Sequence, residues 1–279
     1  MIHKPATPAL DGHQAPSRPL AELPSAALTA VLGVMTDIDD TLTRDGAIEP
    51  AALAALHDLA AARLPVVAIT GRPVGWSRPF AAAWPVAVIV PENGAVALIR
   101  DGSRVLTEYA QDAATRATNA VRLQAAAARV LREVPGATLA RDSAGRETDI
   151  AIDHAEFAQL SPEAVAHVVA VMQAEGLTAT VSSIHVNGWI GHHSKWTAAR
   201  WMLRRLFGRE LDAEIGRWVY VGDSTNDQLM FSHFPLSVGV ANVMDFARQL
   251  EHWPAYITPG ERGVGFAEVA TRLLAARAG

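Results

Sequence analysis

The chain has 279 residues, of which 50% are hydrophobic, and its formal net charge is -5. This length and composition allow a sizeable core in one large or two modest domains. The negative net charge predicts no basic surface for nucleic acid. Because the chain contains no cysteine, it has neither a disulfide framework nor a thiolate site, and any metal must bind to Asp, Glu, Asn or His.

The N-terminal 30 residues are rich in proline. They contain Pro5, Pro8, Pro16, Pro19 and Pro24, with short apolar stretches between them. This composition predicts a flexible arm over residues 1–30. The arm lacks the continuous apolar centre of a secretory signal, and no apolar run in the chain reaches the roughly 18 residues of a membrane span. We therefore expect a cytoplasmic protein without membrane association, as a monomer or homodimer.

The first apolar run, residues 31–35, leads directly to Asp37 and Asp39. Residues i and i+2 of a strand share a face, so these two carboxylates are expected to lie side by side. Like charges at that distance are costly unless a cation lies between them, and Mg²⁺ is a hard cation that prefers oxygen ligands. The pair also offers a nucleophile and a proton donor, although Asp and Thr are equally typical of a simple turn.

Two further apolar runs, residues 66–69 and 218–221, also precede polar loops, and residues 86–90 predict another strand. Continuous apolar strands are typical of a parallel sheet buried on both faces. The pattern of residues 50–62 predicts a helix with Pro50 at its first position, which completes a βαβ unit. Ligands of such sheets bind beyond the carboxyl ends of the strands, where all of these polar loops lie.

The middle of the chain has a different pattern. It predicts, in order, a helix at 111–134, strands at 137–141 and 148–153, a helix from Pro162 to about 175, and strands at 177–183 and 184–190. Ser161 is the predicted cap of the second helix, and Gly176 its end. This order favours an open-faced α+β layer at residues 102–188, inserted into the first domain.

Three other polar segments are candidates for chemistry. Thr70, Gly71 and Arg72 follow the second strand, where a hydroxyl and free backbone N–H groups suit an anionic oxygen. Lys195 stands at the start of an apolar-periodic helix at 196–207. Gly222-Asp223-Ser224-Thr225-Asn226-Asp227 ends a buried strand with two acids four residues apart, although it also has the sequence of a helix cap.

Together these segments resemble the four motifs of the haloacid dehalogenase superfamily. Asp37-Ile38-Asp39-Asp40-Thr41 resembles the first motif, Thr70 the second, Lys195 the third, and Gly222-Asp223 through Asp227 the fourth. The insertion between the second and third motifs is similar to the branch with a large α/β cap, which includes sucrose-phosphate, trehalose-phosphate and mannosyl-phosphoglycerate phosphatases. Asp40 departs from the pattern, since many relatives have Gly there.

The resemblance implies an α/β fold with a Rossmann-like, doubly wound parallel sheet as its core, at residues 31–101 and 189–279. The inserted α+β domain at 102–188 would be the cap that determines specificity. It also implies that Asp37 attacks phosphorus and forms an aspartyl-phosphate, while Asp39 protonates the leaving alcohol and later deprotonates water. Thr70 and Lys195 would hold the transferring phosphoryl oxygens.

The predicted site consists of catalytic, metal and substrate residues. The catalytic residues are Asp37, Asp39, Thr70 and Lys195. The expected Mg²⁺ ligands are Asp37, Asp39 (through its carbonyl), Asp223, Asn226 and Asp227. The candidate substrate-binding residues are Thr70, Gly71, Arg72, Asn93, Arg146, His185, Asn187 and Lys195.

These features predict a magnesium-dependent phosphatase of a small phosphorylated metabolite, with a sugar phosphate favoured. One alternative is a phosphosugar mutase of the same fold, which would isomerise its substrate and release no phosphate without a bisphosphate activator. Another is a non-catalytic binding protein on this scaffold, against which the intact Asp37, Asp39, Lys195 and Asp223 argue.

Overall fold

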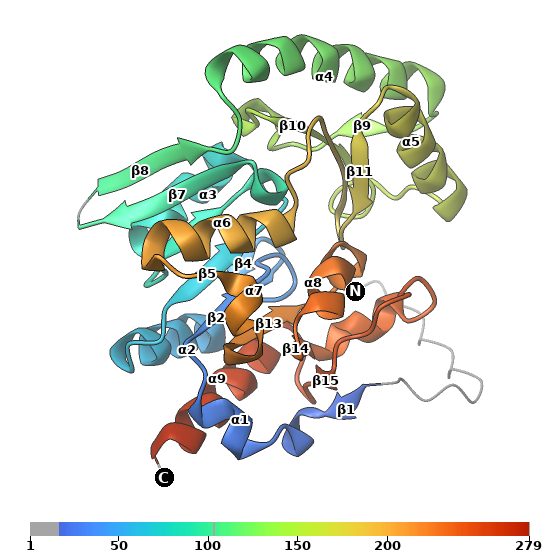
Figure 1. Cartoon of the computed structure of the whole chain (residues 1–279). Coiled ribbons are helices and arrows are strands. Elements are labelled where there is room, and N and C mark those ends of the chain that lie inside the picture. The colour runs from blue at the N-terminus through green and yellow to red at the C-terminus, as the bar shows by residue number, and fades with distance from the viewer. Residues whose placement is uncertain (1–16, 103, 279) are drawn as a thin grey trace.

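The computed structural model describes residues 17–102 and 104–278. Within these residues the chain forms a nine-stranded sheet, a four-stranded sheet and a two-stranded ribbon of β3 (Thr43–Arg44) and β4 (Ala47–Ile48) (Figure 1). None of the helices in this part of the chain has both the length and the apolar character needed to cross a membrane.

The large sheet is mostly parallel. Its strands are, in spatial order, β1 (Arg18–Pro19), β15 (Tyr256–Ile257), β14 (Leu236–Gly239), β13 (Trp218–Gly222), β2 (Gly33–Thr36), β5 (Val66–Ile69), β6 (Val88–Val90), β7 (Val96–Asp101) and β8 (Arg104–Tyr109). Strands β1 to β6 in this order pair in parallel, whereas β7 and β8 pair antiparallel. The α/β class predicted from the sequence is confirmed.

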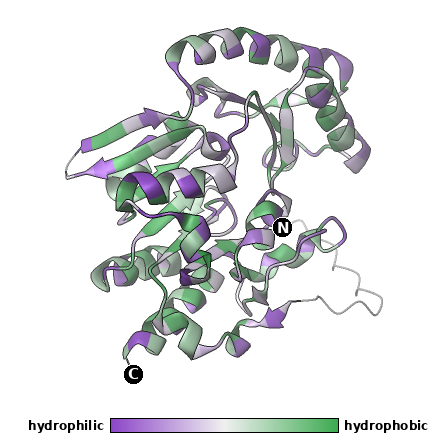
Figure 2. Ribbon diagram, in the orientation of Figure 1, coloured by the Kyte–Doolittle hydropathy of each residue, from purple (hydrophilic) through white to green (hydrophobic). Residues whose placement is uncertain are grey.

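Helices cover both faces of this sheet. One face packs on α1 (Ser25–Thr29), α2 (Pro50–Ala61), α3 (Val74–Ala83) and α9 (Arg262–Ala278), and the other on α6 (Lys195–Phe207), α7 (Leu211–Glu214) and α8 (Gln228–His233). Successive residues of a strand face the two helix layers alternately. Val34 packs in the core on the α9 side of the sheet, and Met35 packs in the core on the α6 side. This double burial explains why the central strands are continuous apolar runs (Figure 2).

The four-stranded sheet is antiparallel and carries its own core. Its strands are, in order, β11 (Thr178–Val181), β12 (His185–Trp189), β10 (Asp149–Asp153) and β9 (Thr138–Leu139). Helices α4 (Ala113–Glu133) and α5 (Pro162–Ala174) pack on its outer face, away from the large sheet (Figure 1). As predicted, the Ser161 side chain caps α5 by accepting a hydrogen bond from the Ala164 amide. We call residues 113–189 the small-sheet unit.

The change from the large sheet to the small-sheet unit comes later than the sequence pattern predicts. Residues 104–109, which the pattern assigns to the insertion, form β8 and pair with β7 from Val96↔Tyr109 to Asp101↔Arg104. Val96 and Leu98 are buried in the core of the large sheet, so this hairpin extends that sheet. The predicted boundary at residue 102 therefore falls inside the β7–β8 hairpin, and the division into two domains stays a prediction.

Residues 17–30 are not the flexible arm that their prolines predict. Strand β1 pairs in parallel with β15, and Leu20, Leu23 and Leu28 are buried in the core on the α9 side of the sheet. The leucines between the prolines supply apolar contacts that outweigh the low helix propensity of the segment. The first 16 residues of the predicted arm lie outside the described part of the chain.

The packing of this segment makes a testable prediction about stability. Leu28 is fully buried, so Leu28→Ala is expected to lower the free energy of unfolding by about 2–5 kcal/mol through lost transfer energy and a residual cavity. Urea denaturation would measure this loss. Ser25→Ala, an exposed position of the same helix, is the control and should change stability by less than about 0.5 kcal/mol. Equal unfolding free energies for Leu28→Ala and Ser25→Ala would contradict the burial of this segment and support the prediction of a flexible arm.

Candidate active site

The predicted catalytic residues meet at the carboxyl edge of three adjacent strands. Strands β13, β2 and β5 lie side by side and are followed at once by Asp223, Asp37 and Thr70. Lys195, the first residue of α6, reaches the same place, and its Nζ lies 3.0 Å from Oδ1 of Asp37. The topology therefore brings together four residues from four separate parts of the chain.

Lys195 is held between two carboxylates. Its side chain is 3% exposed, and its Nζ also lies 2.7 Å from Oδ1 of Asp227. Burial alone would lower the pKa of Lys195, but Asp227 and Asp37 more than offset burial and raise this pKa above its usual value. Lys195 is therefore a fixed positive charge next to Asp37.

Asp227 is fully occupied by donors. Its Oδ1 accepts from Lys195 and from the Tyr220 hydroxyl, and its Oδ2 accepts from the backbone amides of Asp223 and Ser224 at 2.9 and 3.2 Å. Gly222 makes this possible, because a Cβ there would lie 2.5 Å from the Asp227 carboxylate. This geometry makes Asp227 a residue that fixes the Asp223 loop and Lys195.

Asp37 and Asp223 both resist ionisation in their buried surroundings. Burial, followed by the charges of Asp227 and Asp39, raises the pKa of Asp37 to about 7 despite the opposing effect of Lys195. Burial and then the nearby Asp37 also raise the pKa of Asp223 well above its usual value. A cation bound between these two acids would relieve their repulsion and favour the ionised form of both.

The donor chemistry fits a divalent cation bound to oxygen. Asp37, Asp223 and Asp227 each have a carboxylate oxygen within 4.8 Å of the others. Since Asp227 is already occupied, Asp37 and Asp223 are the better ligands, as expected for Mg²⁺. Of the other predicted ligands, Asp39 directs its side chain to Arg72, and Oδ1 of Asn226 lies 3.3 Å from Nζ of Lys195.

These pKa values predict how pH and Mg²⁺ change stability. The pKa of Asp37 in the folded, metal-free protein is raised from 3.8 to about 7, so its contribution to stability is lost as pH rises through this range. Mg²⁺ competes with protons for the carboxylates and is expected to raise the melting temperature more at pH about 8 than at pH about 5. Thermal unfolding in Mg²⁺ and in chelator at both values measures this. A Mg²⁺ effect that is equal at both values would contradict it.

Of the predicted substrate residues after β5, Thr70 contacts Asp39, whereas Gly71 contacts the small-sheet unit. The Thr70 hydroxyl accepts from the Arg72 amide at 3.0 Å and lies 3.4 Å from Oδ2 of Asp39. Gly71 presents its carbonyl to two donors of the small-sheet unit, Nη1 of Arg146 at 3.0 Å and Nδ2 of Asn187 at 3.2 Å. A Cβ at Gly71 would lie 3.1 Å from Oδ1 of Asn187, so this close approach favours glycine.

The candidate substrate residues on the small-sheet unit bind mainly to carboxylates of the same unit. Arg146 is buried and pairs with Asp149 at 2.8 Å, and Asn187 contacts the same carboxylate at 3.2 Å. His185 Nε2 lies 3.0 Å from Oε2 of Glu156. Arg146 and Asn187 therefore fasten the small-sheet unit to the Gly71 loop.

Asn93 lies on another side of the site. Asn93 is buried in the 3-10 turn η2 (Glu92–Gly94). Its backbone amide donates a hydrogen bond to the Thr70 carbonyl at 2.9 Å. Its side chain lines a cavity of about 330 Å³ together with Lys195 and Asn226. Asn93 is thus next to the catalytic residues without facing the acidic pocket described next.

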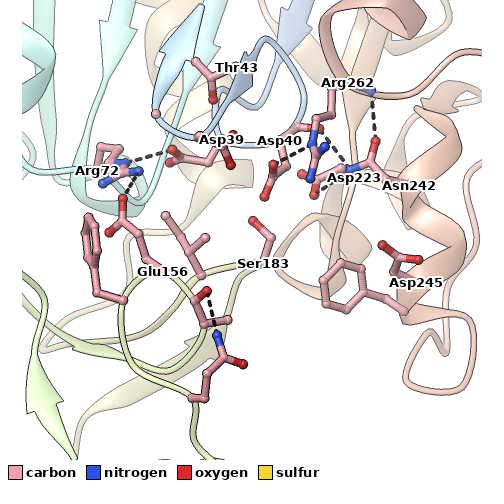
Figure 3. A pocket seen from close by; sticks show the side chains of 17 residues that line it. Asp39, Asp40, Thr43, Arg72, Glu156, Ser183, Asp223, Asn242, Asp245 and Arg262 are labelled. Atoms are coloured by element: carbon pink, nitrogen blue, oxygen red, sulfur yellow. Dashed lines mark hydrogen bonds and ion pairs between the residues drawn. The ribbon is translucent and has the colours of Figure 1, made fainter. Parts of the chain in front are cut away.

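A pocket of about 410 Å³ opens between the large sheet and the small-sheet unit (Figure 3). Asp39 and Asp223 line it from the large sheet, and Glu156, Ser183 and nearby loop residues line it from the small-sheet unit. Asn242, Asp245 and Arg262 also line the pocket on the side of the large sheet. These three residues were not predicted from the sequence as site residues. Their only sequence signals are their positions after β14 and at the start of α9.

Asp40 belongs to the wall of this pocket. It has a left-handed backbone conformation with φ of 52°, which costs a non-glycine residue more than glycine. Its Oδ1 accepts from Nε of Arg262 at 2.8 Å, and its carbonyl accepts from Nδ2 of Asn242 at 3.0 Å. The ion pair explains how an acid is kept where glycine would be easier.

Comparison with known proteins agrees with this arrangement. Residues 34–126, which contain Asp37, Asp39 and Thr70, match the family profile of haloacid dehalogenase-like hydrolases. No curated protein sequence matches this chain.

The fold of this chain is similar to that of several solved structures. A protein from Thermoplasma acidophilum has a TM-score of 0.68 at 16% identity, over 88% of this chain and 98% of that one. A HAD/COF-like hydrolase from Plasmodium vivax has a TM-score of 0.65 at 17% identity, over 90% and 99%. The sucrose-phosphatase of Synechocystis, solved with sucrose and phosphate, has a TM-score of 0.62 at 14% identity, over 87% and 97%.

Proposed function

We propose that this protein is a Mg²⁺-dependent phosphatase of a small phosphorylated metabolite, with a sugar phosphate as the favoured substrate. The observation that carries the proposal is the Asp37 carboxylate, placed 3.0 Å from the buried Lys195 ammonium and next to Asp223 at the edge of the sheet. A nucleophile and a fixed positive charge in contact suit an anionic electrophile such as a phosphate ester. The similarity in fold to a sucrose-phosphatase supports the choice of substrate class.

In the first step, Asp37 attacks phosphorus and the bond to the leaving alcohol breaks. Asp39, whose Oδ1 is bound by Arg72, gives its proton to the leaving oxygen. Lys195 and the Thr70 hydroxyl hold the phosphoryl oxygens, whose charge is spread over three positions in the transition state. The products are the alcohol and an aspartyl-phosphate on Asp37.

In the second step, water attacks the aspartyl-phosphate. Asp39, now ionised, takes the proton of this water, and the bond between phosphorus and Asp37 breaks to release inorganic phosphate. Bound Mg²⁺, held by Asp37 and Asp223, would neutralise phosphoryl charge throughout. Lys195 contributes a fixed positive charge 3.0 Å from Asp37.

In this proposal the small-sheet unit acts as the cap and contributes the outer wall of the pocket. Its loop at residues 155–159 and Ser183 with Ile184 face the acids of the core across the pocket. Closure over the reacting groups would exclude bulk water, which strengthens charge interactions. Substrate selection is then expected to depend on these loops more than on Arg146 and Asn187.

A phosphate-release screen tests the proposed function. Purified protein would be assayed in Mg²⁺ and in chelator against glucose 6-phosphate, sucrose 6-phosphate, trehalose 6-phosphate, glycerol 3-phosphate and p-nitrophenyl phosphate. We expect Mg²⁺-dependent release of phosphate from at least one sugar phosphate without a bisphosphate activator. Isomerisation without release would favour a mutase, and no reaction with any ester would refute the proposal.

A further inference from the structure

Arg72 joins the catalytic core to the small-sheet unit. All three guanidinium nitrogens contact carboxylates: Nε lies 2.8 Å from Oδ1 of Asp39, Nη1 lies 3.2 Å from Oδ2 of Asp142, and Nη2 lies 2.8 Å from Oε1 of Glu156. The side chain is only 5% exposed. Arg72 is therefore a buried connection between Asp39 on one side and two acids of the small-sheet unit on the other. Figure 3 shows Arg72 between Asp39 and one of these acids, Glu156.

Glu156 is itself fixed in place. Its Oε1 faces Arg72, its Oε2 lies 3.0 Å from Nε2 of His185, and its backbone amide donates to Oδ1 of Asp153 at 3.0 Å. Burial would raise the pKa of Glu156, but His185 and Arg72 more than compensate and lower it to about 2. Because the oxygens and the backbone of Glu156 are all held, this carboxylate is a rigid anchor for Arg72.

The connection determines which oxygen of Asp39 is available. Arg72 occupies Oδ1, while Oδ2 lies 3.4 Å from the Thr70 hydroxyl and has no guanidinium contact. Arginine has a long side chain with many rotamers, so its orientation depends on the partners at its far end. Without Glu156 the guanidinium could swing away from Asp39 or cover both of its oxygens.

We propose that Glu156 is a positioning residue that acts through Arg72 to direct Oδ2 of Asp39 toward the leaving oxygen of the substrate. This inference rests on the proposed phosphatase function. It gives the small-sheet unit a role in proton transfer besides forming the pocket wall, because docking of Glu156 and Asp142 completes the set of groups around Arg72. A fixed donor is worth more than a mobile one in such a transfer.

The test compares two leaving groups that differ in their need for a proton. p-Nitrophenolate leaves as an anion, whereas the alkoxide of a sugar must be protonated by Asp39. The ratio kcat/KM reports only the steps up to departure of the leaving group, so water attack does not affect it. Glu156→Gln keeps the shape of the side chain but removes its charge, and Glu156→Ala removes the anchor.

We expect Glu156→Gln to lower kcat/KM at least about tenfold for the sugar phosphate turned over fastest in the screen, and less than about threefold for p-nitrophenyl phosphate. Glu156→Ala should widen this difference. The control is Glu175→Gln, which removes a similar pair of the small-sheet unit, the 2.7 Å contact between Arg129 and Glu175, and should leave both values unchanged.

Two other results would overturn the inference, and they differ from failure of the proposed function. If both Glu156 variants lower kcat/KM equally for the two esters, or leave both unchanged, Glu156 has a structural role or none in proton transfer. If the wild-type protein hydrolyses no ester, the proposed function fails and the role of Glu156 fails with it. Urea denaturation of each variant checks that folding is retained.

Discussion

Asp37→Asn is expected to lower kcat for phosphate release by at least about 10⁴-fold while the protein stays folded. The amide has nearly the shape of the carboxylate, so it fits the same buried space beside Lys195, but it cannot form the aspartyl-phosphate. Asp37 is 3% exposed, and no other carboxylate of the described residues contacts Lys195 except Asp227. No neighbouring acid is placed to replace it, since Asp227 is occupied by four donors.

The matched control is Asp101→Asn. Asp101 also ends a strand of the large sheet, β7, but it is exposed and pairs only within the β7–β8 hairpin, so activity should be unchanged. Phosphate release under saturating substrate measures kcat for both variants, and circular dichroism checks their folding. Trapping with hydroxylamine should give a hydroxamate at residue 37 in the wild-type protein and in Asp101→Asn, but not in Asp37→Asn. Normal activity of Asp37→Asn would refute the assignment of the nucleophile.

The proposed catalytic residues could be singled out from the sequence because each stands at a recognisable local boundary. Asp37 and Asp223 follow buried apolar strands, and Lys195 begins an amphipathic helix capped by Ser194. The rule that parallel strands present their carboxyl ends at one edge then brings them together without knowledge of the tertiary contacts. The same apolar patterns predicted four strands of the large sheet, β2, β5, β6 and β13.

The surroundings of the site could not be predicted in this way, because they depend on contacts between distant loops. Asp142 and Glu156 lie 70 and 84 residues from Arg72 in the sequence, in irregular segments without periodicity. Nothing local distinguishes them from solvated surface acids, and only the docking of the small-sheet unit places them on Arg72. In residues 17–30 a local pattern was misleading instead. Their proline content predicted a flexible arm, although three leucines of this segment are buried.

Lys195→Met is expected to lower the free energy of unfolding by about 3–5 kcal/mol and to reduce kcat about 10²- to 10³-fold. Both effects have one cause: the substitution leaves the carboxylates of Asp37 and Asp227 buried without the cation that faces them at 3.0 and 2.7 Å. The loss of stability should be smaller in Mg²⁺ than in chelator, because a bound cation offsets part of the repulsion. Urea denaturation in both conditions would measure the difference.

A double-mutant cycle with Asp227→Asn isolates the contribution of the ion pair. Once Asp227 is neutral, Lys195→Met leaves one fewer unpaired acid, so the double variant is expected to lose about 1–3 kcal/mol less than the sum of the single losses. Arg204→Met, which breaks the solvent-exposed pair of Arg204 and Glu210, is the control and should barely move the unfolding midpoint. If Lys195→Met lowered the free energy of unfolding as little as this control does, the buried contacts of Lys195 with Asp37 and Asp227 would contribute little to stability. That result would contradict the fixed positive charge on which both the nucleophile and the phosphoryl site depend.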